Sequence, residues 1–195
     1  MLRCRRMNFF DLGYFVFLAV SWPYWLIRPA ARNKARAAFA NRMGHVPQRD
    51  GNQPAVLIHA VSLGEVNATP ALVAELSRRS PGLRFIITTT TDTGFAQGKK
   101  LYGQNPNVLL VRYPLDFSFA VRRFLDALRP TVVVLMELEL WPNFLRICRR
   151  RGLPVVLING RITERSFQRY RMILPFSRAM FRSLAGTCAQ DQKYA

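Results

Sequence analysis

The sequence predicts an α/β fold, in which a parallel sheet carries helices on both faces and is preceded by a hydrophobic helix. Three observations lead to this prediction. From residue 55 onward, short runs that are apolar throughout alternate with longer segments of helical spacing. Strands that are apolar at every position are typical of a parallel sheet covered on both faces. Half of the 195 residues are hydrophobic, which is enough for one domain with a true core.

The predicted strands are the short apolar runs: AVLIHAV (55–61), LRFIITTT (83–90), VLLVRYP (108–114), TVVVLME (131–137), PVVLING (154–160) and the weaker GTCAQ (186–190). Helices are predicted in the intervals between them, over 66–79, 93–103, 117–128, 141–151 and 163–183. Thr69 and Pro70 lie inside the range predicted for the first helix, and they are typical of an N-cap followed by proline at the first helical position. This pair predicts a break in the helix.

The segment from Phe9 to Ile27 is apolar except for Asp11, and basic residues flank it on both sides. Aromatic residues near its end favour a membrane interface. Its 16 residues from Leu12 onward fall short of the roughly 20 that span a bilayer squarely. We expect a membrane anchor or interfacial helix with Asp11 at the headgroup boundary; a signal peptide and a buried core helix are the alternatives. The expected divisions of the chain are 1–30 for this helix, 31–54 for a basic linker and 55–195 for the α/β domain.

The charge balance predicts an anionic partner. The formal net charge is +18, and 25 of the 29 basic residues are arginine. Arginine binds phosphates and carboxylates in a bidentate manner, so nucleic acid, phospholipid headgroups and a phosphorylated substrate all remain open. Genomic codon bias is the alternative cause. The three cysteines have no metal-binding spacing, and two histidines are too few for a multi-histidine metal site. No metal is therefore predicted.

Polar motifs follow each strong strand: SLGE, TTTTDTG, YPLD, ELELWPN and NGRIT. An open α/β sheet binds ligands outside the carboxyl ends of its strands, so a site is expected among these motifs. Helix N-termini that point at the same edge favour anions. Neither GxGxxG nor GxxxxGK[ST] occurs, which disfavours dinucleotide and P-loop sites. Six of the nine acidic residues after position 54 lie at or just behind strand ends: Glu65, Asp92, Asp116, Glu137, Glu139 and Glu164.

Taken in order, HAVSLGE, TTTTDTG, YPLD, ELELWPN, NGRIT and SFQRY strongly resemble the N-terminal half of the 3-deoxy-D-manno-octulosonic acid (Kdo) transferases of Gram-negative lipid A assembly. The likeness runs from about Phe9 to the end of the chain. Leu138 departs from it, because the family usually has a small polar residue between the two glutamates; NGRIT is a milder departure. The resemblance implies a GT-B glycosyltransferase with two Rossmann-like domains and the active site between them. The chain ends where the nucleotide-sugar domain should begin, so we expect an N-terminal half, either a fragment or a truncated reading frame.

The resemblance implies that Glu65, the glutamate of the Ser-x-Gly-Glu motif, is the general base. It would take the proton of the acceptor hydroxyl that attacks the anomeric carbon of Kdo, and inversion needs no covalent intermediate. We expect Glu65 at the carboxyl edge of the sheet, partly exposed and free of a bidentate arginine pair; a helix cap is the alternative role. Glu137 and Glu139 are expected to face one side, and at least one of them is expected to position the acceptor or the base. The alternative for this pair is one solvent-facing and one helix-capping glutamate.

The remaining expectations concern ligands. No cofactor is expected beyond the donor substrate, CMP-Kdo. Arg161 is expected to bind phosphates or the Kdo carboxylate, with a solvated helix face as the alternative, whereas His59 is expected to be a satisfied core or rim histidine. The predicted substrate-binding residues are Ser62, Gly64, Thr90, Asp92, Asn159 and Arg161.

The implied partners are a lipid A precursor, CMP-Kdo, anionic lipids of the inner membrane and the C-terminal GT-B domain. The implied location is the inner membrane, with the catalytic domain on the cytoplasmic side. Nucleic acid is not expected, because carboxylates at the strand ends would repel its phosphates. Two alternatives remain: a non-catalytic basic α/β module that binds anionic lipid or nucleic acid, and another GT-B enzyme acting on a lipid acceptor, against which ELWPN argues.

Overall fold

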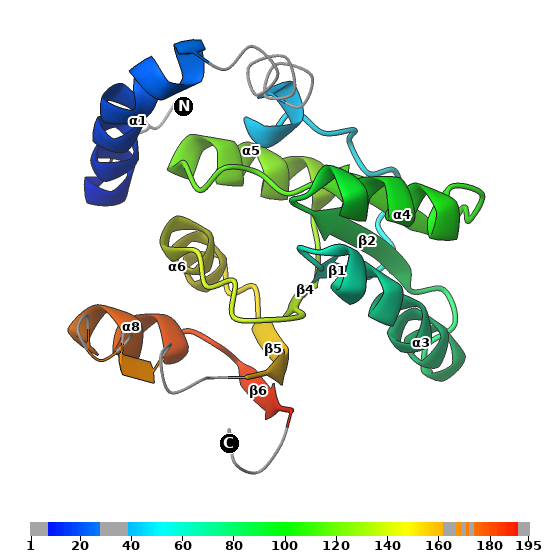
Figure 1. Ribbon diagram of the computed structural model, residues 1–195. Coiled ribbons are helices and arrows are strands. Elements are labelled where there is room, and N and C mark those ends of the chain that lie inside the picture. Colours follow the sequence, from blue (N-terminus) through cyan, green and yellow to red (C-terminus); the bar gives the residue numbers. More distant parts are fainter. Residues whose placement is uncertain (1–7, 28–38, 162–166, 169–170, 172–173, 191–195) are drawn as a thin grey trace, which may run out of the picture.

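The computed structural model describes residues 8–27, 39–161, 167–168, 171 and 174–190. Its centre is a six-stranded parallel sheet in the order β3-β2-β1-β4-β5-β6 (Figure 1). Each strand lies within the range predicted for it, so the parallel sheet is confirmed. The strands are β1 (Ala55–His59), β2 (Arg84–Thr89), β3 (Val108–Arg112), β4 (Val132–Leu135), β5 (Val155–Gly160) and β6 (Gly186–Ala189).

Helices cover both faces of the sheet, as predicted (Figure 1). The strand β1 shows why, since its alternate side chains enter different cores. Leu57 joins Phe124 and Phe144 in one core, and Ile58 joins Val66 in the other. The first core is packed under α5, α6 and α8, and the second under α3 and α4. The helices are α1 (Phe9–Ile27), α3 (Leu63–Arg79), α4 (Asp92–Tyr102), α5 (Ser118–Leu128), α6 (Pro142–Arg150) and α8 (Leu174–Phe181).

The strand order reverses between β1 and β4. The chain adds β2 and β3 on one side of β1 and then returns to place β4 on its other side. In the register of the sheet, His59 at the end of β1 lies between Thr88 and Leu135. Ligands of open α/β sheets bind in the crevice at such a reversal. The loops that follow β1, β2 and β4 therefore meet at the place where a site is expected.

The predicted break in the first helix of the domain is wrong. The N-cap of α3 is Ser62, and the helix runs without interruption through Pro70. Proline has no N–H, so the carbonyl of Val66 loses its helical donor. The hydroxyl of Thr69 donates to that carbonyl at 2.7 Å and replaces the missing bond. Thr69 thus acts inside the helix, and the first turn is capped seven residues earlier.

The expectation that Asp11 lies at a headgroup boundary is also wrong. Its side chain is 1% exposed and accepts hydrogen bonds from the backbone N–H of Ser118 at 2.7 Å and from its hydroxyl at 2.6 Å. Ser118 begins α5, and the residue before it, Phe117, provides no side-chain cap. Asp11 therefore caps α5 from a distant part of the chain, and it attaches the start of α1 to the body.

Beyond this attachment, α1 presents an apolar surface to solvent. Phe9 is 82% exposed and Val20 is 75% exposed, and Leu12, Val16 and Phe17 are each more than half exposed. Side chains from 21 to 27 lie outside the described part of the chain. Of the helices that the structure describes, none is long and apolar enough to cross a bilayer. Phe9 and Phe17 are accessible to lipid, whereas the rings of Tyr14 and Phe15 pack on Phe117.

Residues 39–54, the described part of the expected linker, run along α5. Arg49 holds them there, because its guanidinium donates to the carbonyls of Leu128 and Arg129 at the end of that helix, at 2.8 and 3.1 Å. The backbone N–H of Arg49 also donates to the carbonyl of Ala127 at 3.0 Å. This segment thereby completes the C-terminus of α5 and leads the chain into β1.

Candidate active site

Glu65 lies in the first turn of α3, directly after β1. One carboxylate oxygen, Oε1, accepts from the backbone N–H of Ser62 at 3.1 Å and from its hydroxyl at 2.7 Å. The other, Oε2, accepts from the backbone N–H of Val61 at 2.9 Å. The side chain of Ser62 in turn accepts from the N–H of Glu65, which completes a capping box. The helix-cap alternative is thus present in the structure.

The capping box buries Glu65 more than expected, to 9% exposure. No arginine among the described residues forms an ion pair with it. A carboxylate offers about four lone-pair positions, and three are occupied here. Among the described residues, one position on Oε2 has no donor and could accept from a sugar hydroxyl. Capping and proton acceptance are therefore compatible at this residue.

Glu137 and Glu139 lie on the loop after β4. Two tight turns shape this loop, with the N–H of Glu139 bonded to the carbonyl of Glu137 at 2.7 Å and that of Trp141 to Glu139 at 3.1 Å. The indole of Trp141 also donates to the carboxylate of Glu139 at 2.8 Å. Because β4 ends at Leu135, strand periodicity does not set their directions. Glu137 is exposed, and Glu139 is half-buried.

Electrostatic interactions connect Glu65, Glu137, Glu139 and Arg161. Although Glu137 is exposed, partial desolvation of its carboxyl group raises its pKa above the ordinary value; the charge of Glu65 raises it further, and that of Arg161 lowers it. Burial likewise raises the pKa of Glu139; the hydrogen bond from Trp141 lowers it, and the charges of Glu65 and Glu137 raise it. The structure therefore assembles these residues from the ends of three different strands.

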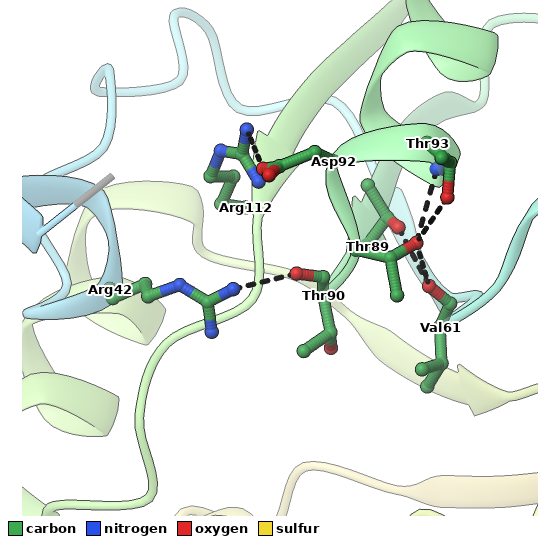
Figure 2. Close-up of polar contacts among 9 residues, drawn as sticks. Arg42, Val61, Thr89, Thr90, Asp92, Thr93 and Arg112 are labelled. Atoms are coloured by element: carbon green, nitrogen blue, oxygen red, sulfur yellow. Dashed lines mark hydrogen bonds and ion pairs between the residues drawn. The ribbon is translucent and has the colours of Figure 1, made fainter. Parts of the chain in front are cut away.

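The threonine run after β2 contacts the loop that holds Glu65 (Figure 2). The hydroxyls of Thr89 and Thr91 each donate to the carbonyl of Val61 at 3.0 Å. Thr91 is also the N-cap of α4 and accepts from the N–H of Gly94 at 3.1 Å. A Cβ on Gly94 would lie 2.5 Å from the Thr89 hydroxyl and 2.9 Å from that of Thr91. The glycine of TTTTDTG is therefore required for this close approach.

Two predicted ligands in the same motif have protein partners (Figure 2). Asp92 forms an ion pair with Arg112 at 2.7 Å, and the guanidinium of Arg112 lies over the ring of Phe95, 4.5 Å from its centroid. The backbone carbonyl of Thr90 accepts from Arg42 at 2.7 Å. These contacts order the end of β2 and the start of α4. Roles of Thr90 and Asp92 in substrate binding stay predictions.

Other predicted ligands are exposed at the same edge. Asn159 has a left-handed backbone, with φ of 55°, at the irregular end of β5, a conformation that asparagine tolerates better than most residues. Arg161 follows it and is exposed. At Gly64, a Cβ would meet only the Ser62 hydroxyl, at 3.9 Å. Glycine at this position leaves the surface beside Glu65 open. Glu164 lies outside the described residues.

Asp116, the acidic residue of YPLD, lies away from this group and has a structural role. Its carboxylate accepts from the backbone N–H groups of Asn143 and Phe144 at 2.9 and 2.8 Å, and from the hydroxyl of Tyr14 at 2.9 Å. Asp116 thus caps α6 and contacts α1. Burial raises its pKa to about 6, although the three donors lower it. A local sequence pattern could not identify this cap, because its helix lies 27 residues away.

His59 is a core residue, as predicted, but only one of its ring nitrogens has a partner among the described residues. Nδ1 is 2.9 Å from the hydroxyl of Thr88, whereas Nε2 is buried without a hydrogen bond. The imidazole stacks on the ring of Tyr113, with centroids 3.8 Å apart. Burial lowers the pKa of His59 to about 3, so the ring is neutral.

Comparison with known proteins finds a matching family model and several similar transferases. The family model for 3-deoxy-D-manno-octulosonic-acid transferase matches residues 37–195. A transferase of that name from Haemophilus influenzae is 34% identical over 157 residues, which is 80% of this chain and 36% of that protein. Another, from Chlamydia pneumoniae, is 28% identical over 191 residues, or 94% of this chain and 42% of that protein. The chain thus spans less than half the length of these relatives.

Proposed function

Because the chain belongs to the 3-deoxy-D-manno-octulosonic acid transferase family, we propose that it forms the acceptor-binding half of an inverting enzyme that transfers Kdo from CMP-Kdo to a lipid A precursor. The observation that carries this proposal is the group formed by Glu65, Glu137 and Glu139 where the strand order reverses. It supplies an acceptor for one proton at the edge where such sheets bind ligands.

In this proposal, Glu65 is the general base. Its unoccupied lone-pair position on Oε2 accepts the proton of the acceptor hydroxyl as that oxygen attacks the anomeric carbon of Kdo. The bond from that carbon to the phosphate oxygen of CMP breaks, and CMP leaves. Glu137 and Glu139 position the acceptor sugar, and the open surface at Gly64 admits it. Arg161 supplies a cation for the anionic groups of the substrates. A C-terminal GT-B domain holds the nucleotide of the donor.

Kdo transfer is tested with a two-domain protein that carries this chain as its N-terminal half. Incubation with CMP-Kdo and a lipid A precursor should release CMP and increase the acceptor mass by one or more Kdo residues. Residues 1–195 expressed alone should produce neither product, because the proposed donor-binding domain is not among them. A folded two-domain protein that consumed no CMP-Kdo in the presence of the acceptor would contradict the proposal.

We also propose that α1 rests on the cytoplasmic surface of the inner membrane and brings the domain to its lipid acceptor. The exposed apolar face of α1 and the net positive charge support this location. The anionic lipids of that membrane would then be partners.

Replacement of Phe17 and Val20 by serine should weaken binding of this chain to phosphatidylethanolamine/phosphatidylglycerol vesicles at least about tenfold, since each buried side chain of this size contributes about 1.5–3 kcal/mol. Cosedimentation at moderate salt measures the effect. Leu101→Ser is the matched control, because Leu101 is an exposed apolar residue on α4. Equal binding of all three proteins would show that the basic surface, and not α1, holds the domain on the vesicle.

A further inference from the structure

The carbonyl of Val61 receives an unusual number of donors for a loop residue outside the sheet. The hydroxyl of Thr89 donates to it at 3.0 Å (Figure 2). The hydroxyl of Thr91 also donates to it at 3.0 Å, and the N–H of Thr91 lies at 3.4 Å. A carbonyl has two lone pairs, so the two hydroxyls saturate it. Thr89 is fully buried, and this carbonyl is the one hydrogen-bond partner that its hydroxyl has among the described residues.

The same peptide group contacts Glu65. The carbonyl of Val61 and the N–H of Ser62 belong to one rigid plane, so a bond that fixes the first also fixes the second. That N–H donates to Oε1 of Glu65 at 3.1 Å. A carbonyl that accepts hydrogen bonds also polarises the N–H of its own peptide and strengthens its donation. The two threonine hydroxyls are therefore connected to the carboxylate through one peptide group.

We infer that Thr89 and Thr91 are positioning residues for the base: by holding the peptide between Val61 and Ser62, they keep Oε1 of Glu65 occupied and Oε2 directed at the acceptor. This inference rests on the proposed function. The packing around Gly94 supports it, because a Cβ there would lie 3.3 Å from the carbonyl of Val61 as well as against both hydroxyls. The start of α4 thus packs directly on the peptide that orients Glu65.

Thr89→Val is the most informative change, since it removes the hydroxyl with little change of shape, and Thr89 caps no helix. In the two-domain protein, we expect kcat to fall about tenfold to a hundredfold with KM nearly unchanged, because the carboxylate of Glu65 stays near the acceptor hydroxyl but is less well aligned with it. Thr131→Val is the matched control: its hydroxyl also donates to a carbonyl of β1, that of Ala55 at 2.9 Å, at the opposite end of the strand.

A double-mutant cycle separates positioning from a general structural role. In a Glu65→Gln background, adding Thr89→Val should cause no further loss of kcat, because the hydroxyl acts through Glu65. An equal loss in both backgrounds would overturn the inference. Thr91→Val, at a half-exposed position, is the second variant if Thr89→Val does not fold, and the same pattern is expected from it.

A readout without catalysis distinguishes failure of this inference from failure of the proposed function. In the chain itself, Thr89→Val should speed hydrogen exchange of the Ser62 amide at least about tenfold, as expected when a hydrogen bond to a charged group is weakened. Thr131→Val should leave that amide unchanged. Unchanged exchange of the Ser62 amide in Thr89→Val would overturn the positioning role of Thr89, even if the enzyme transfers Kdo. Faster exchange in a protein that does not transfer Kdo would support the positioning of the peptide and contradict the proposed Kdo transfer.

Discussion

Glu65→Gln should lower the turnover of Kdo transfer about 10²–10⁴-fold in a two-domain protein that carries this chain, since general-base catalysis contributes an acceleration of that order. Glutamine is nearly isosteric and removes the basic oxygen. The capping box accepts glutamine at this position, but the amide nitrogen leaves the N–H of Val61 without its acceptor, so the free energy of unfolding should fall by about 1–3 kcal/mol. A loss of rate far larger than this loss of stability can explain, in a protein that stays folded, is the signature of a chemical role.

The assay compares purified wild-type and variant proteins for CMP release and acceptor mass at saturating substrates. Glu75→Gln is the matched control, because Glu75 is on the same helix and pairs only with the exposed Arg78 and Arg79 among the described residues. It should retain the wild-type rate. A Glu65→Gln enzyme with more than about a tenth of the wild-type rate, outside the range for general bases, would leave Glu65 as a helix cap. The base would then be sought at Glu137 or Glu139.

Much of the fold was predictable because its strands are apolar on both faces. A run such as AVLI at 55–58 has no polar side to present to solvent, so its place in the centre of a covered sheet follows from composition. The boundary of α3 was not predictable from the local signal at Thr69 and Pro70. There the hydroxyl of Thr69 replaces the bond that proline cannot make, and the capping box already begins the helix.

The grouping of residues at the candidate site was predictable from the sequence, but their detailed contacts were not. Parallel strands end at one edge, so motifs after β1, β4 and β5 had to meet, and Glu65, Glu137 and Arg161 do so. The sequence could not show how tightly Glu65 is held, because that depends on the side-chain rotamer in the capping box. Nor could the sequence reveal helix caps whose side chains come from a distant part of the chain. Asp11 and Ser118 are 107 residues apart, and no periodic pattern connects them.

The largest effect on stability is expected at Asp116. Asp116→Ala would leave the N–H groups of Asn143 and Phe144 and the hydroxyl of Tyr14 without their acceptor. A buried polar group left unpaired costs about 1–3 kcal/mol, so the free energy of unfolding should fall by about 3–5 kcal/mol, measured by urea titration of the chain at pH 7. Asp126→Ala is the control, since Asp126 is an exposed partner of Arg151 and should cost less than about 1 kcal/mol.

The pH dependence of stability provides a sharper test of the same residue. Burial raises the pKa of Asp116 from 3.8 to about 6 in the folded chain. Between these values the folded state retains a proton that the unfolded state has released, so this group's contribution to stability falls mainly as pH rises from about 4 to about 6, and it is constant above about pH 7. Two pKa units correspond to about 3 kcal/mol. Asp116→Asn cannot titrate, so the difference in unfolding free energy between wild type and Asp116→Asn should decrease by about 2 kcal/mol from pH 4 to pH 6, and by about 3 kcal/mol over the whole range from about pH 3 to about pH 7. A difference that stayed flat or increased over this range would mean that the donors from α6 and α1 outweigh burial and keep the carboxylate charged.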